Sequence, residues 1–417
     1  MTHERLRVLV VADSYPPDNS GGAARVTQQV VDGLRGSGCD VLVITHGRQS
    51  GCPWIHRIAS GAVGFMNAII HRGWPLASTF GPDVIEFSGP VGVLMLARPK
   101  LLGCRVPPTV GVVHGLVHQE RLAVRRQPVD RDLSFGPDLQ QHLFRFVRAP
   151  TMMALERLRA RWCDHIAFVS AAAQAGWQRR YGRVARSCVL YNPVDTDFWR
   201  PDSQAGARLR RRLGLEAAGI VLYAGVFRAV KGLDVLLRAM PQVVRHRPEA
   251  VLVVAGGRPD QQDQFRRLAD RLGLDTHVRF LGWLDSAALR ECFQAADVVA
   301  LPSRYDAFPL TVLEAMSCGR CVVASDVGGV SEAICRPDLG CTVPPERADL
   351  LAGSLIRILG DVAGRQAMGE AARRHVVERH SLARVVDARL SLYRSQLQAG
   401  QLAQRHRSRS SSATTQR

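Results

Sequence analysis

Short apolar runs alternate with segments of helical periodicity along most of the chain. Leu6–Val11 is the first run, and a loop rich in proline and glycine and a helical pattern over Ala23–Leu34 follow it. Unbroken runs of aliphatic and β-branched residues are typical of strands buried on both faces of a parallel sheet. The same pattern predicts strands at Val41–Thr45, Val84–Phe87, Thr109–His114, His165–Ser170, Ser187–Leu190, Ile220–Ala224, Ala250–Ala255, Val278–Phe280, Val298–Pro302 and Cys321–Ala324.

The alternation is interrupted once, over Asn192–Arg212, where prolines, a glycine and polar residues predict a linker. Two such series joined by a linker predict an α/β protein with two Rossmann-like domains that face a central cleft. We expect an N-terminal domain over residues 1–198 and a C-terminal domain over 199–380. A last helix, at about 380–398, is expected to pack back on the N-terminal domain. Residues 401–417, which lack an apolar face, are expected to form a disordered basic tail.

Ligands of such sheets bind beyond the carboxyl ends of the strands, so residues that follow strands are the candidates for a site. Two of these positions carry weak signals. Gly21 and Gly22 stand at the start of a helix, where glycine and free amides suit a phosphate, but a plain tight turn would look the same. His114, at the end of a strand, fits a site residue or a satisfied core histidine equally well. The pattern G-x-G-x-x-G is absent after the first strand, which argues against an NAD-dependent dehydrogenase.

Two basic residues follow the predicted strand Ile220–Ala224. Arg228 and Lys231 precede a helix, and two fixed cations at a helix start suit a diphosphate, although an exposed basic turn would show the same residues. Lys231 stands out because Lys100 is the only other lysine among 55 basic residues. Lysine is a compact point charge, and arginine does not replace it freely beside a leaving group.

A third loop follows the predicted strand Val298–Pro302. Pro309 suits the first position of a helix, which would leave the backbone amides of residues 308–311 free for an anion. Asp306 lies just before this helix, and Glu314 lies within it among apolar residues. A carboxylate in such surroundings is costly unless it is paired or bonds a ligand. A helix cap and a structural salt bridge would also explain the two acids.

In their order and spacing, these residues resemble a known family. The chain resembles the retaining glycosyltransferases of the GT-B fold, family 4 (glycosyl transferases group 1), over about Leu6–Tyr393. The matching segments are Tyr15-Pro16-Pro17 with Gly21-Gly22, Asn192-Pro193-Val194-Asp195, Gly225–Gly232, the acids Asp306 and Glu314 with seven residues between them, and Gly328-Gly329-Val330-Ser331-Glu332. The resemblance implies a transferase that takes a UDP- or GDP-linked sugar as a substrate and needs no cofactor and no metal.

The resemblance also implies a role for each matching residue. Donor-binding residues would be Gly21, Gly22, Arg228, Lys231, Phe308, Pro309, Leu310 and Glu314. Catalytic residues would be His114, Lys231 and Asp306. Arg228 and Lys231 would hold the diphosphate, Glu314 the ribose, and His114 the donor sugar near its reacting carbon. The sequence departs from the family at Asp306, where glutamate is usual, which leaves the donor open, and at Pro193, where glycine is common.

The net charge of +18 predicts an attraction to anions. Nine arginines and four acids lie between Arg121 and Arg161, and Leu143–Trp162 alternates apolar residues and arginines like a helix. This region is either a solvated helix face or a patch that rests on an anionic membrane. We found no nucleic-acid-binding motif.

The sequence further indicates a cytoplasmic protein, at most peripheral to a membrane. No apolar stretch approaches the ~20 residues that span a bilayer, and no signal peptide is visible. Cys318 and Cys321 form a CxxC without the second pair that a zinc ribbon needs, so reduced thiols are expected. Two alternatives remain beside the transferase: a nucleotide-sugar epimerase of the same fold, and a non-catalytic nucleotide-sugar-binding protein. The acceptor, expected to be a lipid-linked, polysaccharide or small-molecule hydroxyl, and the oligomeric state stay open.

Overall fold

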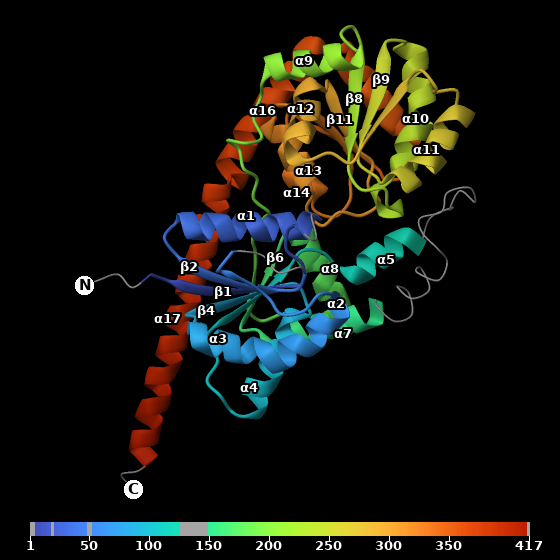
Figure 1. The fold of residues 1–417 in the computed structure, drawn as a ribbon. Coiled ribbons are helices and arrows are strands. Elements are labelled where there is room, and N and C mark those ends of the chain that lie inside the picture. Colours follow the sequence, from blue (N-terminus) through green and yellow to red (C-terminus); the bar gives the residue numbers. More distant parts are fainter. Residues whose placement is uncertain (1–4, 18–20, 48–51, 126–148, 415–417) are drawn as a thin grey trace.

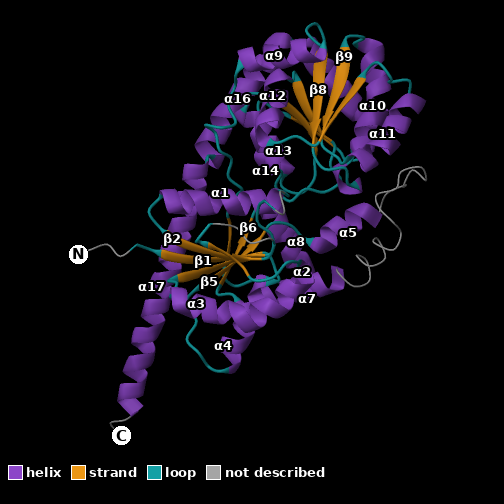
Figure 2. Ribbon diagram, viewed as in Figure 1, coloured by secondary structure: helices purple, strands orange, loops and turns teal. Residues whose placement is uncertain are grey.

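The computed structural model describes residues 5–17, 21–47, 52–125 and 149–414. Within these ranges the chain forms two α/β domains, one above the other in Figure 1, each with a parallel sheet between layers of helices (Figure 2). The predicted fold class is confirmed.

The first sheet has the strand order β3-β2-β1-β4-β5-β6-β7 in the described residues. Its strands are β1 (Arg7–Ala12), β2 (Asp40–Thr45), β3 (Ile55–Arg57), β4 (Val84–Ser88), β5 (Thr109–Val113), β6 (His165–Phe168) and β7 (Ser187–Val189). The helices of this domain are α1 (Gly22–Gly36), α2 (Ala62–Ala68), η1 (Ile69–Gly73), α3 (Trp74–Phe80), η2 (Gly92–Leu96), α4 (Ala97–Leu101), α5 (Val117–Arg125), α7 (Ala149–Trp162) and α8 (Ala171–Tyr181).

Both faces of this sheet are buried, as the unbroken apolar runs predicted. In β1, Val8 and Val10 pack in the cluster that includes α1, whereas Leu9 and Val11 pack against the opposite layer with Phe65 of α2. Successive side chains of a strand point to opposite faces, so a strand covered on both sides must be apolar throughout.

The second sheet has the strand order β10-β9-β8-β11-β12-β13 in the described residues. Its strands are β8 (Gly219–Ala224), β9 (Ala250–Ala255), β10 (Val278–Gly282), β11 (Val298–Leu301), β12 (Cys321–Ser325) and β13 (Cys341–Val343). The helices are α9 (Ser203–Leu213), η4 (Ala229–Lys231), α10 (Leu233–His246), α11 (Pro259–Arg271), α12 (Ser286–Ala295), α13 (Leu310–Ser317), α14 (Val330–Ala333), α15 (Ala348–Gly360) and α16 (Val362–His380).

One expectation for the linker is wrong, because residues 203–212 of the predicted Asn192–Arg212 linker belong to the helix α9. The side chain of Asp202 caps this helix by accepting a 2.9 Å hydrogen bond from the amide of Ala205. Gly206, which suggested a loop, is needed for packing: a Cβ there would lie 2.3 Å from the carbonyl oxygen of Gln294 on the neighbouring helix α12.

The end of the chain returns to the N-terminal domain as α17 (Leu382–Thr414), which contacts α1. A buried ion pair fastens it there, since Arg389 of α17 donates to both carboxylate oxygens of Glu86 on β4, each at 2.5 Å. The hydroxyl of Tyr393 donates to Glu86 as well, at 2.5 Å. The helix is described through Thr414, residues 415–417 lie outside the described ranges, and the expected disorder of the tail over residues 401–417 stays a prediction.

The arginine-rich region is described only in part. The helix predicted at Leu143–Trp162 is α7 from Ala149 onwards, and its first residues lie outside the described ranges. Most of the basic region Arg121–Arg161 lies outside them too, so its expected membrane contact stays a prediction.

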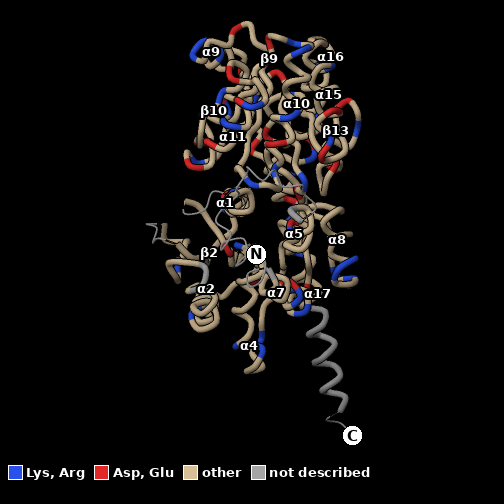
Figure 3. Tube along the Cα trace, turned by 90° about the vertical axis from the view of Figure 1, so that its right-hand side faces the viewer, with Lys and Arg blue, Asp and Glu red and all other residues tan. Residues whose placement is uncertain are grey.

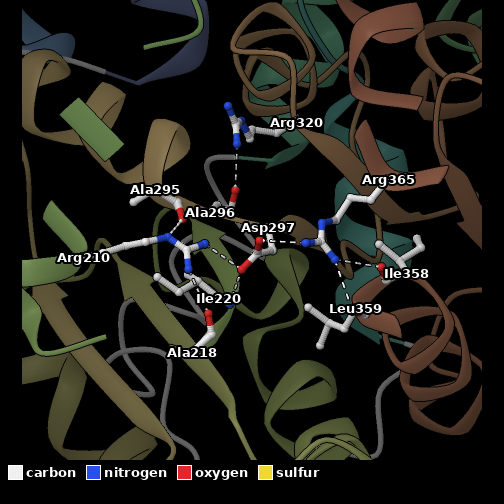
Figure 4. Close-up of polar contacts among 10 residues, drawn as sticks. All are labelled: Arg210, Ala218, Ile220, Ala295, Ala296, Asp297, Arg320, Ile358, Leu359 and Arg365. Atoms are coloured by element: carbon white, nitrogen blue, oxygen red, sulfur yellow. Dashed lines mark hydrogen bonds and ion pairs between the residues drawn. The ribbon is translucent and has the colours of Figure 1, made fainter. Parts of the chain in front are cut away.

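Asp297, at the amino end of the inner strand β11, connects several elements of the C-terminal domain (Figure 4). Its carboxylate accepts hydrogen bonds from Arg210 of α9 at 2.7 Å, from Arg365 of α16 at 3.1 Å and from the amide of Ile220 at 2.8 Å. Arg210 also donates to the carbonyls of Ala295 and Ala218, so one ion-pair network joins α9, α12, β8 and α16.

Candidate functional site

The carboxyl ends of strands from both sheets meet where the two domains touch, and the loops that follow these strands form what we call the interdomain seam. From the N-terminal domain it takes the start of α1, the ends of β4 and β5, and α5. From the C-terminal domain it takes the loops after β8, β11 and β12. Most of the predicted site residues lie on these segments.

Lys231 and Asp306 lie in direct contact across two neighbouring loops. The Nζ atom of Lys231 lies 2.5 Å from Oδ2 of Asp306. Gly232, which follows Lys231, has a φ of 68° that favours glycine, and a Cβ there would lie 2.0 Å from the carbonyl oxygen of Pro302. Glycine therefore lets the β8 loop approach the β11 loop closely enough for this pair to form.

Arg228 reaches the other domain. Its guanidinium forms an ion pair with the carboxylate of Glu120 on α5. The side chain of Arg228 is 56% exposed, so the pair lies at the rim of the seam. Nearby, the hydroxyl of Tyr305 accepts a 3.0 Å hydrogen bond from the amide of Leu116. The segment after β5 is thus held against the loops after β8 and β11 of the C-terminal domain.

The loop before α13 is packed from two sides. Asn192 of the linker donates to the carbonyl of Phe308 at 2.9 Å. From the β12 side, Gly328 has a φ of 56°, and a Cβ there would lie 1.8 Å from the carbonyl oxygen of Asp306. Pro309 is the N-cap of α13 rather than its first residue, and no side chain of the described residues caps this end of the helix. Leu310 begins the helix, so the predicted amides lie at its N-terminus.

Glu314 is buried with 1% of its side chain exposed, and Arg25 of α1 donates to its Oε1 at 2.8 Å. Oε2 has no hydrogen-bond partner among the described residues. Burial raises the pKa of the Glu314 carboxyl, and the charge of Arg25 offsets part of that rise. The sequence left open whether Glu314 forms a structural ion pair or contacts a ligand. Oε1 forms the ion pair with Arg25, and Oε2 is available for a ligand.

His114 follows β5 and is held by a short chain of hydroxyl groups. Its Nε2 lies 2.8 Å from Oγ of Ser88, which in turn lies 2.5 Å from Oγ1 of Thr27. Burial, with the charges of Arg389 and Arg159, lowers the pKa of His114 to about 3. The imidazole is therefore neutral at pH 7 and acts as a hydrogen-bonding group rather than a cation.

Gly21 and Gly22 begin α1, as predicted, but neither is required by backbone strain. Gly21 has a φ of −61°, and a Cβ at Gly22 would meet no atom of the described residues within 4 Å. Glu332, in the segment after β12, accepts 2.8 and 2.7 Å hydrogen bonds from the amides of Ala171 and Ala172. It thus binds the N-terminus of α8 in the opposite domain, a connection that the sequence did not indicate.

Arg25, Glu120 and Tyr305 are the seam residues that sequence reasoning missed. Arg25 lies in the first turn of a helix that was itself predicted to face the site, and this placement was the available signal. Glu120 had no local signal, since its partner Arg228 is 108 positions away.

The described residues also bear on metal binding, on the cysteines and on a membrane span. No group of three or more His, Cys, Asp or Glu among the described residues could hold a metal ion. Cys318 and Cys321 are buried free thiols, and burial raises the pKa of each to about 12. No helix in the described ranges combines the length and the apolar character that a bilayer crossing requires.

Comparisons with known proteins agree with this architecture. The family described as Glycosyltransferase Family 4 matches residues 20–198, and Glycosyl transferases group 1 matches residues 207–375. An uncharacterized glycosyltransferase of Methanocaldococcus jannaschii is 26% identical over 93% of this chain and 98% of its own length. A D-inositol 3-phosphate glycosyltransferase of Saccharomonospora viridis is 38% identical over 49% of each chain. The crystal structure of Anabaena HepE with UDP and glucose superposes with a TM-score of 0.74 at 20% identity, over 94% of this chain and 100% of that one.

The chain has two domains, each built on a parallel sheet, with a seam between them. Together with the comparisons, this architecture identifies a glycosyltransferase of the GT-B fold, an enzyme of the hexosyltransferase type. Within this class, the chain belongs to family 4, the glycosyl transferases group 1.

Proposed function

We propose that the protein transfers a hexose from a UDP- or GDP-linked donor to a hydroxyl acceptor, with retention of the anomeric configuration and without a metal ion. The observation that carries this proposal is the contact between Lys231 and Asp306 beside the start of α13, with Arg228 three residues away on the same loop. HepE, the structural neighbour of the same fold, holds UDP and glucose, which supports a nucleotide-sugar as donor.

The chemistry requires charge stabilisation at the leaving group. When the anomeric C–O bond stretches, negative charge builds on the departing diphosphate. Lys231, Arg228 and the N-terminal amides of α13 supply fixed positive potential for that charge. Because such groups act more strongly on the transition state than on the bound donor, they raise turnover rather than affinity alone.

The remaining residues position the donor. Neutral His114 would bond a sugar hydroxyl near the reacting carbon, and Oε2 of Glu314 would accept from a ribose hydroxyl. Asp306 would orient Lys231 and the sugar. The acceptor hydroxyl would belong to a lipid-linked, polysaccharide or small-molecule acceptor and would attack from the face that the diphosphate leaves.

The test compares Lys231→Ala with Arg267→Ala, which removes an exposed cation from α11 of the same domain. Turnover with UDP-glucose or GDP-mannose is expected to fall by about 100-fold or more in Lys231→Ala, with a much smaller change in donor affinity by thermal shift. Arg267→Ala is expected to match the parent protein. Equal turnover of both variants would remove Lys231 from the mechanism, and proton NMR of the product tests retention. Donor binding without turnover would indicate a sensor, and interconversion of the donor sugar without an acceptor would indicate an epimerase.

A further inference from the structure

Two exposed leucines stand side by side at the tip of the N-terminal domain. Leu101 ends α4 and Leu102 follows it, and their exposed fractions are 87% and 66%. Among the large apolar side chains of the described residues, these two are the most exposed and the only adjacent pair. Removing apolar surface from water is favourable, so two neighbouring leucines in water form an exposed apolar patch that would gain from a partner.

Backbone hydrogen bonds fix the turn that exposes these leucines. The amide of Leu102 donates to the carbonyl of Arg98 at 3.0 Å, and the amide of Cys104 donates to the carbonyl of Pro99 at 2.8 Å. Gly103 has a φ of 64°, which is the left-handed residue that closes such a helix end. Pro99 itself is buried, so the helix is anchored on one side while the leucines point outward.

Basic residues flank the leucines along the chain. We define residues 97–108 as the leucine finger, which contains Arg98, Lys100 and Arg105, all exposed, and no acidic residue. The finger lies at the end of the N-terminal domain farthest from the C-terminal domain, with Lys and Arg marked beside α4 (Figures 1 and 3). An exposed apolar tip flanked by cations suits the surface of an anionic bilayer, because leucines can insert among the acyl chains while the cations contact the headgroup phosphates.

We propose that the leucine finger docks the enzyme on an anionic membrane surface. This surface differs from the basic region Arg121–Arg161 that the sequence suggested. A protruding two-leucine tip is small for a protein interface, which needs a broad complementary area of about 800 Å² on each partner. A bilayer needs no complementary surface, so two leucine side chains can insert into it.

The experiment measures sedimentation of the full chain with vesicles, without donor or acceptor, so its outcome is independent of the transferase proposal. The parent protein is expected to bind vesicles of phosphatidylcholine with 30% phosphatidylglycerol more tightly than pure phosphatidylcholine vesicles. Leu101→Ser/Leu102→Ser is expected to weaken binding about tenfold or more. Lys100→Ala is expected to weaken it about fivefold, in a salt-dependent manner.

The matched control is Leu350→Ser, which removes an exposed leucine of α15 in the C-terminal domain and is expected to leave binding unchanged. Thermal melting of each variant reports whether it is folded. The proposal is overturned if the double leucine variant is folded and binds the anionic vesicles as tightly as the parent. It is also overturned if that variant changes the oligomeric state in gel filtration without lipid, since the leucines would then contact a second copy of the chain.

Discussion

The two domains share one topology but place their charged groups differently. In the N-terminal domain, Glu86 lies in the middle of β4 with 2% of its side chain exposed, and it is paired with Arg389 of α17. In the C-terminal domain, the ion-pair centre Asp297 lies at the amino end of the inner strand β11, with 17% of its side chain exposed. The first ion pair therefore lies inside a sheet, whereas the second lies at the end of a strand, where it is closer to water.

Through Arg389, the helix α17 is coupled both to Glu86 in the core and to His114 in the seam. Among the described residues, the counter-charge and the hydroxyl that satisfy Glu86 come from Arg389 and Tyr393, about 300 positions later in the chain. The same Arg389, together with buried Arg159, helps to keep His114 neutral. The C-terminal domain closes its own network with residues of its own segment. We therefore expect the N-terminal domain to respond more strongly to the loss of a single charge.

The largest effect is expected for Glu86→Ala. It leaves Arg389 buried without its counter-ion, and breaking a buried pair in this way costs about 3–5 kcal/mol. The free energy of unfolding in urea measures the loss. The double variant Glu86→Leu/Arg389→Met is the control, because an apolar replacement of both partners should recover most of the stability. A single-variant loss below about 1 kcal/mol would contradict the comparison.

A smaller loss, of about 2 kcal/mol, is expected for Asp297→Asn. The amide keeps one acceptor oxygen for Ile220 or Arg210 but removes the charge, and the partly exposed arginines regain water. The same urea titration measures it. If Asp297→Asn were as damaging as Glu86→Ala, the position of the charge within the sheet would not be what distinguishes the domains.

The next effect is a pH dependence that belongs to His114. Its pKa is lowered from 6.5 to about 3 on folding, so below pH 6.5 the unfolded chain binds a proton that the folded chain does not, and stability falls as pH falls. Asp13 works in the opposite direction, since burial raises its pKa to about 6. The difference between the parent and His114→Asn isolates the histidine. It should be constant above pH 7 and shrink by about 1 kcal/mol by pH 5.5. Parallel stability curves would show that His114 keeps its ordinary pKa.

The sequence predicted the strands that are buried on both faces, because such strands are apolar without interruption. It missed β3 and β13, three-residue strands at the sheet edges whose residues are largely half-exposed or exposed. The α9 segment was read as a linker because Gly206 looks like a loop residue until the neighbouring helix is in place. For the site, the loops were predictable because they follow strands. The pairs Arg25–Glu314 and Arg228–Glu120 were not, since each joins two domains and depends on how they dock.

The smallest effect is expected at the pair that crosses between the two domains. Glu120→Gln removes the carboxylate that would compete with the donor diphosphate for Arg228 under the proposed function. Because an exposed pair contributes at most about 1 kcal/mol, the donor KM should fall only about two- to threefold at low salt, and the change should vanish at high salt. Glu291→Gln is the matched control, since its partner Arg212 is exposed to a similar degree, 64% against 56% for Arg228, but lies within the C-terminal domain. A decrease in KM in both variants would reflect net charge alone, whereas a decrease confined to Glu120→Gln would show that the N-terminal domain regulates access to a cation of its neighbour.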